Sequence, residues 1–344
     1  MLDIDGSHGE GGGQLLRTAV ALAAVTGRPA RIGNIRARRK KPGLAAQHLT
    51  AVRAVGELCS ARIEGLALGA RELQVVPGAP RGGEFRFDVG TAGSVTLVLQ
   101  ALVPVMLASG RACRVVVVGG TDVRAAPPLD YFRAVLLRLL ERMGARLRLA
   151  VRRRGYFPRG GGQVELALEP GTRLRPFAAA GPGRLLGVGG TAHVANLPLH
   201  IAERMRAAAL GALGTVSAAS PQLEVAALGE DEAQGSGGAI VAWADTEASV
   251  LGAGEVAQRG VRAETLGERV GASLRDDLEA GASLDVHAAD QLLVYLALAG
   301  GKSVFTTRTL SSHARTAMWL IEQFLPARFD AAAQGARLTR VDVR

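Results

Sequence analysis

The predicted secondary structure repeats along the chain, and this repetition limits the possible folds more than any other feature of the sequence. The first unit reads as strand 3–5, helix 11–26, strand 30–36, helix 43–59 and strands near 61–68 and 72–77. The same order returns as strand 84–89, helix 93–108, strand 113–118, helix 127–143 and strands 146–152 and 163–168. A unit of about 80 residues with one sheet and two helices cannot bury its sheet alone, so the units must pack together.

A third copy of the unit is interrupted. Its first strand is predicted at 173–178, and the rest follows as helix 288–299, strand 302–307, helix 312–325 and strands 327–332 and 337–343. The interrupting segment reads as a strand near 185–194, helix 198–213, strands near 222–228, 239–244 and 248–255, and helix 261–279. We therefore predict an α/β (α+β) protein. Residues 1–183 and 281–344 form a large domain of three two-helix, four-stranded units, and residues 184–280 form a smaller α/β domain inserted in the third unit.

Composition indicates a globular protein with an excess of positive charge. Of the 344 residues, 48% are hydrophobic and 21% are charged, and 41 Lys and Arg outnumber 31 Asp and Glu. This excess favours a polyanionic partner, either a nucleotide or nucleic acid. Cys59 and Cys113 provide neither a disulfide framework nor a metal-ligand spacing. The N-terminus lacks signal-peptide features and no apolar run is long enough to span a membrane, so we expect a cytoplasmic protein without membrane association.

Residues 5–17, DGSHGEGGGQLLR, form a glycine-rich loop that leads into a helix. Four of the five residues 9–13 are glycine, and the exception is Glu10. Glycine lets the backbone approach a ligand closely, and the N–H groups at a helix start favour anions. Gln14 and Arg17 lie one helical turn apart, and both can donate hydrogen bonds to phosphate oxygens. The alternative is a tight turn whose glycines serve packing alone.

Two further segments concentrate positive charge. Residues 36–41, RARRKK, are held between a predicted strand and a helix, which favours phosphate binding over a solvated tail, and Gln47 and His48 follow closely. Residues 152–163, RRRGYFPRGGGQ, place arginines beside two aromatic side chains. This segment suits phosphate binding and base stacking, and a hairpin with a solvated basic edge is the alternative.

Polar residues in three apolar helices are candidate ligand contacts. Gln100 must find a partner, either the backbone or a ligand. Asp290 and Gln291 either cap their helix or hold a ligand and metal. Ser311 or Ser312 can cap the helix in which His313 then occupies the first turn. The positive end of a helix disfavours protonation, so this imidazole is expected to be neutral near pH 7 and available as a nucleophile, although a lone histidine is often structural.

Taken in order along the chain, these segments resemble the RNA 3′-terminal phosphate cyclase family. The matching blocks are GEGGGQLLR (9–17), IRARRKKPGLAAQHLTAV (35–52), GTAGSVTLVLQ (90–100), GGTDVRAAPP (119–128), RGYFPRGGGQV (154–164), HAADQLLVYLALAG (287–300) and SSHARTAMWLIEQFLP (311–326). The resemblance is weakest in 184–280. It implies three repeated units with a smaller inserted α/β domain, and ATP-dependent conversion of an RNA 3′-phosphate to a 2′,3′-cyclic phosphodiester. In the implied reaction a histidine takes AMP from ATP, the AMP moves to the RNA 3′-phosphate, and the neighbouring 2′-hydroxyl expels it.

The resemblance also implies roles for individual residues. His313 matches the nucleophile, Glu10 matches a ligand of Mg²⁺ or Mn²⁺ near the triphosphate, and Arg17 matches a catalytic phosphate contact. The implied ATP contacts are Gln100, His287, Ala288, Ala289, Asp290 and Gln291, and the implied phosphate or RNA contacts are Arg36, Arg39 and Gln47. Some members carry Tyr at the position of His287. The implied partners are ATP and RNA with a 3′-phosphate, with no obligate protein partner.

Two other functions remain open from the sequence. A noncatalytic relative acts in ribosomal RNA processing and lacks the histidine, so a basic RNA-processing scaffold is one alternative. A small-molecule transferase of similar repeated architecture is the other, and it predicts no dependence on RNA.

Overall fold

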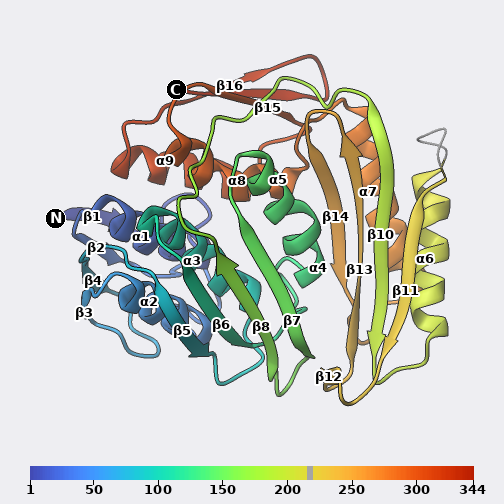
Figure 1. Ribbon diagram of the computed structural model, residues 1–344, viewed down its shortest axis with the longest axis horizontal. Helices are drawn as coiled ribbons and strands as arrows, with labels where there is room; N and C mark the ends of the chain where they lie inside the picture. The colour runs from blue at the N-terminus through green and yellow to red at the C-terminus, as the bar shows by residue number, and fades with distance from the viewer. Residues whose placement is uncertain (215–219) are drawn as a thin grey trace.

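Three of the sheets in the computed structural model, which describes residues 1–214 and 220–344, share one strand order (Figure 1). The first is β1 (Leu2–Asp5), β2 (Ala30–Gly33), β4 (Leu73–Val76), β3 (Arg62–Glu64). The second is β5 (Gly83–Asp88), β6 (Cys113–Gly119), β8 (Gly162–Leu168), β7 (Leu147–Gly155). The third is β9 (Ala178–Ala179), β15 (Ser303–Thr307), β17 (Thr339–Val343), β16 (Phe329–Ala333). In each, the first two strands pair in parallel and the other pairs are antiparallel.

The helices that accompany these sheets pack on one another and carry most of the core. They are α1 (Gly13–Thr26), α2 (Ala46–Leu58), α3 (Val95–Ser109), α8 (Val286–Ala299), α9 (Ser312–Phe324), and a continuous helix made of α4 (Leu129–Tyr131), the π-helical η1 (Phe132–Leu137) and α5 (Arg138–Arg142). Helix α1 contacts α2, α3 and α9, and α8 contacts α9. The glycine-rich loop before α1 and the starts of α8 and α9 therefore lie near one another.

Local backbone conformation explains where the predicted boundaries differ. The strand predicted at 30–36 ends at Gly33, because Asn34 and Arg36 have φ of 48° and 54°. Such values interrupt an extended strand. The helix predicted at 127–143 is observed from Leu129 to Arg142, but with a π-helical turn that hydrophobic periodicity does not indicate.

Segment 184–280 contributes a fourth sheet, on one side of the molecule in Figure 1. Its elements are β10 (Leu185–Ala195), α6 (His200–Leu213), β11 (Gln222–Leu228), β12 (Ala233–Gln234), β13 (Gly237–Thr246), β14 (Val250–Val256) and α7 (Ala263–Glu279). The sheet order is β11-β10-β13-β14, and the short β12 instead joins the edge of β7. Helices α6 and α7 pack on one face and enclose a second hydrophobic core.

The other face of this sheet packs against the helix that runs from Leu129 to Arg142. Gly252 of β14 permits the approach, because a Cβ at this position would overlap the side chain of Val135. Val241 and Val250 belong to the large core rather than to the second one. The strand β14 is thereby fixed beside the helices of the larger part of the chain, and its end reaches the cavity described below.

The fold is α+β, as predicted. The division into a large domain (1–183 and 281–344) and an inserted domain (184–280) stays a prediction. The structure does have a recurring strand order and a second hydrophobic core in these parts of the chain. Among the described residues, no helix is long and apolar enough to cross a membrane.

Candidate functional site

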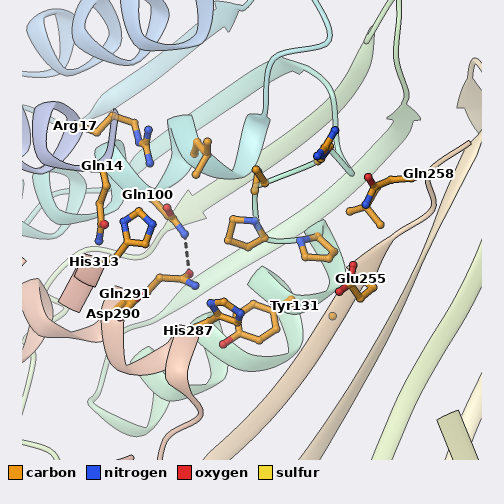
Figure 2. Close-up of a pocket in the computed structure, with 18 residues that line it drawn as sticks. Gln14, Arg17, Gln100, Tyr131, Glu255, Gln258, His287, Asp290, Gln291 and His313 are labelled. Atoms are coloured by element: carbon orange, nitrogen blue, oxygen red, sulfur yellow. Dashed lines mark hydrogen bonds between the residues drawn. The ribbon is translucent and has the colours of Figure 1, made fainter. Parts of the chain in front are cut away.

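A cavity of about 390 Å³ lies where α1, α3, α8 and α9 meet the end of β14 (Figure 2). It is lined by Gln14, Arg17, Leu97, Gln100, Arg124, Ala125, Ala126, Pro127, Pro128, Tyr131, Gly254, Glu255, Val256, Gln258, His287, Asp290, Gln291 and His313. These residues come from six separate parts of the sequence. The cavity therefore exists only when the units and segment 184–280 are assembled.

His313 lies in the first turn of α9, as the serine cap predicts. The Ser311 side chain accepts a hydrogen bond from the Ala314 backbone N–H at 3.0 Å, and its hydroxyl donates to Asp290 Oδ1 at 2.6 Å. His313 Nδ1 is buried and has no hydrogen-bond partner in the part of the chain that the structure describes; Glu10 Oε2 is 3.7 Å away. Nδ1 thus faces Glu10, and Nε2 is the ring nitrogen that remains available as a nucleophile in the cavity.

The surroundings of His313 favour its neutral form. Burial lowers the pKa of His313 below its usual 6.5, and Arg39 and Arg17 lower it further while Asp290 opposes them. Burial also raises the pKa of Asp290 to about 6, against the hydrogen bond from Ser311. At neutral pH the site therefore holds an uncharged imidazole beside an ionised carboxylate.

Arg17 is a buried cation that lacks a protein partner. Its side chain on α1 is 8% exposed, and it forms no hydrogen bond or ion pair with any described residue. Burial and the nearby Arg36 lower its pKa to about 10, so it remains charged at neutral pH. Burying an uncompensated guanidinium is costly, and a ligand anion in the cavity would supply the missing charge.

Glu10 ties the glycine-rich loop to the helix of His313. Its backbone N–H donates to Thr316 Oγ1 at 3.0 Å, and that hydroxyl donates to the Ser312 carbonyl at 2.7 Å. The Glu10 carboxylate is 11% exposed and contacts the Arg39 guanidinium. The described residues include no cluster of three or more acidic, His or Cys side chains that would form a metal cage. A metal at Glu10 would accordingly need oxygen ligands from a substrate and water, as Mg²⁺ commonly has.

The predicted helix residues on the other wall are also brought to the cavity. Gln100 Nε2 donates to Gln291 Oε1 at 2.7 Å, so the two half-buried amides are paired (Figure 2). The His287 ring meets the Tyr131 ring edge-on, with centroids 6.5 Å apart. A flat ring and a pair of amides on one wall are suited to a nucleoside.

Asp285, which no sequence pattern indicated, connects the elements that form this wall of the cavity. Its carboxylate accepts hydrogen bonds from the His287 and Ala288 backbone N–H groups, both at 2.9 Å, and so caps α8. The Tyr131 hydroxyl donates to Asp285 Oδ1 at 2.7 Å, and the Gly252 N–H donates to Oδ2 at 2.9 Å. One buried carboxylate therefore joins α8, α4 and β14.

Several predicted site residues lie elsewhere. Ala288 and Ala289 are fully buried and do not line the cavity, because they face the core from the first turns of α8. Gln47 Oε1 accepts a hydrogen bond from the Ser94 N–H at 3.1 Å and so connects α2 with the start of α3. Arg36 donates to the Gly43 carbonyl at 2.7 Å, and Arg39 is engaged with Glu10. None of these five residues lines the cavity, so their predicted ligand contacts stay predictions.

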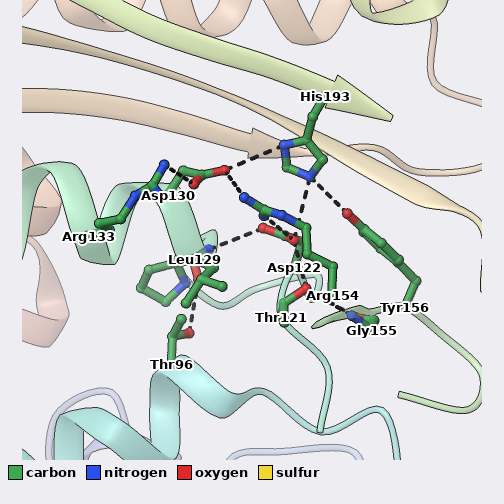
Figure 3. Close-up of polar contacts among 11 residues, drawn as sticks. Thr96, Thr121, Asp122, Leu129, Asp130, Arg133, Arg154, Gly155, Tyr156 and His193 are labelled. Carbon is green, nitrogen blue, oxygen red and sulfur yellow. Dashed lines mark hydrogen bonds and ion pairs between the residues drawn. The ribbon is translucent and has the colours of Figure 1, made fainter. Parts of the chain in front are cut away.

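Segment 152–163 was predicted to bind phosphate and to stack on a base. The prediction is wrong for Arg154 and for Tyr156. Arg154 is buried between two carboxylates, and the Tyr156 side chain is buried with its hydroxyl 2.8 Å from His193 Nε2 (Figure 3). Arg152 pairs with Glu165 at 3.2 Å. Phe157 is 82% exposed and is the one predicted stacking side chain that remains accessible. Alternate residues of a strand face opposite sides, so a run of three arginines does not show which one points inward.

Eleven cavity residues were not predicted as contacts, and the polar or aromatic ones among them are Arg124, Tyr131, Glu255 and Gln258. Pro127 and Pro128 were interpreted only as the start of a helix. They do precede α4, and they line the cavity as well. Glu255 and Gln258 lie at the end of β14, where the sequence has no motif. No local signal identifies them, because only tertiary packing brings β14 to the cavity.

A buried cation, an imidazole and carboxylates gathered at one cavity are the groups that suit a phosphorylated ligand. Comparison with known proteins gives the family. The model of the RNA 3′-terminal phosphate cyclase family matches residues 8–331, and the chain belongs to that family.

Three relatives named RNA 3′-terminal phosphate cyclase match over nearly their whole length. The protein of Nitrosospira multiformis is 57% identical, over 99% of this chain and 96% of its own. That of Methanopyrus kandleri is 43% identical, over 100% and 99%. That of Ignicoccus hospitalis is 46% identical, over 95% and 93%.

Proposed function

We propose that this protein is an enzyme that uses ATP to convert RNA 3′-phosphate ends into 2′,3′-cyclic phosphodiesters. Its relatives are named RNA 3′-terminal phosphate cyclase. The single observation that supports the proposal best is the juxtaposition at one cavity of His313, whose Nδ1 faces Glu10, and Arg17, a buried cation without a counter-ion among the described residues. A nucleophile and an anion site are what nucleotidyl transfer requires.

The proposed reaction has three balanced steps. In the first, His313 Nε2 attacks the α-phosphorus of ATP, an N–P bond forms, and the bond to the β-phosphate oxygen breaks to release pyrophosphate. In the second, an oxygen of the RNA 3′-phosphate attacks the same phosphorus, the N–P bond breaks, and His313 is restored. In the third, the ribose 2′-hydroxyl loses its proton and attacks the activated 3′-phosphate, which closes the ring and releases AMP. Arg17 stabilises the negative charge that develops on the phosphates.

The residues present fit Mg²⁺ or Mn²⁺ at Glu10. This carboxylate is mostly buried, lies 3.7 Å from His313 Nδ1, and would be one protein ligand alongside triphosphate oxygens. When bound, the ion would supply charge neutralisation for the triphosphate. On the other wall, His287 and Tyr131 would contact the nucleoside, with Gln100 and Gln291 as polar partners. The cytoplasmic location and the independence from a protein partner stay predictions.

The proposal is tested with ATP labelled at the α-phosphate and an RNA oligonucleotide that ends in a 3′-phosphate. The protein is expected to take up acid-labile label, and the RNA end is expected to become resistant to phosphatase. The matched control is the same oligonucleotide with a 3′-hydroxyl, which should not change. Labelled protein without any change in the RNA would favour a small-molecule transferase. An unlabelled protein that still binds RNA would favour a processing scaffold.

Replacing Glu10 by glutamine is expected to slow label uptake about tenfold or more, because an amide binds a divalent cation more weakly than a carboxylate does. The fold should persist, since the Glu10 contact with Thr316 is made by the backbone N–H. The measurement is the initial rate of labelling as the Mg²⁺ concentration is raised. A normal rate at every concentration would assign the loop a structural role only.

The pH dependence of label uptake should report the titration of His313. Because burial lowers its pKa below 6.5, the rate is expected to be constant near neutrality and to decline only on the acid side of 6.5. Asp290→Asn removes a negative neighbour that raises this pKa, so the acid limb should move to lower pH. The amide oxygen can still accept the hydrogen bond from Ser311. An acid limb that moves to higher pH would contradict the assignment, whereas one that stays in place would show that Asp290, whose own pKa is about 6, is already protonated there.

A further inference from the structure

A buried ionic network lies behind one wall of the cavity and takes no part in the proposed chemistry (Figure 3). Arg154 Nη1 is 3.0 Å from Asp122 Oδ2, and Arg154 Nη2 is 2.6 Å from Asp130 Oδ2. His193 faces both carboxylates, with Nε2 3.7 Å from Asp122 and Nδ1 3.5 Å from Asp130. The Tyr156 hydroxyl is 2.8 Å from His193 Nε2. Arg133 adds an ion pair to Asp130 from the surface.

Asp122 and Arg154 hold each other in their ionised forms. Burial by itself would raise the pKa of Asp122, but Arg154 and His193 more than offset this and lower it well below its usual range. The two carboxylates keep the pKa of Arg154 high in spite of its burial. Breaking such a network leaves an unpaired buried charge, so its geometry is strongly determined.

The network closes the loop that forms the cavity wall. Asp122 Oδ1 accepts a hydrogen bond from the Leu129 N–H at 3.1 Å, so the two ends of loop 123–128 are joined. The Thr96 hydroxyl donates to the Pro127 carbonyl at 2.9 Å and fixes the same loop to α3. Residues 124–128 line the cavity. A displacement of Asp122 would therefore move the wall directly.

The network also reaches segment 184–280 through His193. This residue lies on β10, in the sheet whose edge strand β14 supplies Gly254 and Glu255 to the cavity. Loop 123–128 and the end of β14 both line the cavity, together with Tyr131 and His287. Fixing His193 against Asp122 thus fixes one side of the cavity relative to the other.

We propose that Asp122, Arg154 and His193 are positioning residues, whose buried network sets the spacing between loop 123–128 and β14 and thereby the affinity for ATP. This inference rests on the proposed function, because it takes ATP as the ligand of the cavity. Segment 184–280 then has a defined role: it completes the nucleotide site through one buried histidine.

The test measures equilibrium binding of ATP by calorimetry, with every variant built on His313→Ala so that no chemistry interferes. His193→Gln is expected to raise the Kd for ATP about tenfold, because it removes the ring that faces both buried carboxylates and pairs with the Tyr156 hydroxyl. Tyr156→Phe removes only one hydroxyl and is expected to raise the Kd about threefold, so it provides a milder variant if His193→Gln folds poorly. Melting temperatures identify the variants that are folded.

Asp245→Asn is the matched control. Asp245 on β13 forms an ion pair with Arg138 of α5, so it joins the same two parts of the chain without touching loop 123–128. Its Kd for ATP is expected to stay within about twofold of the parent, since a half-exposed ion pair contributes little. Equal Kd values for His193→Gln, Tyr156→Phe and the parent would overturn the inference alone. So would an equal loss of affinity in Asp245→Asn. A parent protein that does not bind ATP would overturn the proposed function and this inference with it.

Discussion

A His313→Ala variant is expected to take up no label from ATP and to lose RNA cyclisation by at least about 10⁴-fold, the scale on which loss of a covalent nucleophile is felt. The side chain is 42% exposed, and its Nδ1 has no hydrogen-bond partner. Its removal should therefore leave the melting temperature nearly unchanged. Labelling is measured on acid-quenched protein, and cyclisation on the 3′-phosphorylated oligonucleotide.

His8→Ala is the matched control for this prediction. His8 lies in the same glycine-rich loop as Glu10 and stacks on Trp319 of α9, with ring centroids 3.7 Å apart, but it does not line the cavity. We expect this variant to be labelled at close to the normal rate. Normal labelling of His313→Ala, or loss of label in His8→Ala alone, would place the nucleophile elsewhere.

The fold class follows from the order of elements in the sequence, because a two-helix, four-strand pattern constrains each segment in turn. The exact boundaries do not follow. Strand β2 stops at Gly33 because of the positive φ of Asn34, and a single sequence does not show that a non-glycine residue adopts such a conformation. The same applies to the π-helical turn at Phe132–Leu137, which a helical period of 3.6 residues does not reveal.

The candidate site also contains some residues that can be predicted from the sequence and others that cannot. Glu10, Arg17 and His313 stand in local contexts whose chemistry can be predicted: a glycine loop, a helix start and a serine cap. Tyr131 and Glu255 do not, because their place at the cavity depends on how β14 packs beside α4. Arg154 shows the opposite error, since a basic run that looks exposed in sequence contains a residue buried by two aspartates.

Arg17→Met is expected to separate activity from stability. Methionine keeps much of the side-chain volume but removes a buried charge that has no partner among the described residues. The free energy of unfolding should therefore stay the same or rise by about 1 kcal/mol, because the cost of burying the charge disappears. Label uptake should fall about 10²- to 10³-fold, since the triphosphate loses a preorganised cation as charge develops. Arg17→Lys keeps the charge without the planar fork and should give an intermediate rate.

Arg28→Met is the matched control at the end of the same helix. Arg28 donates hydrogen bonds to the carbonyls of Gln323 and Phe324, at 2.9 and 3.1 Å, and lies away from the cavity. Its replacement should cost about 1 kcal/mol of stability and leave label uptake per folded molecule unchanged. The two variants thus have opposite expected profiles, measured by urea unfolding and by initial labelling rate. If Arg17→Met instead unfolds at lower urea while labelling normally, the buried guanidinium serves the core, and the anion site must be sought among the other arginines.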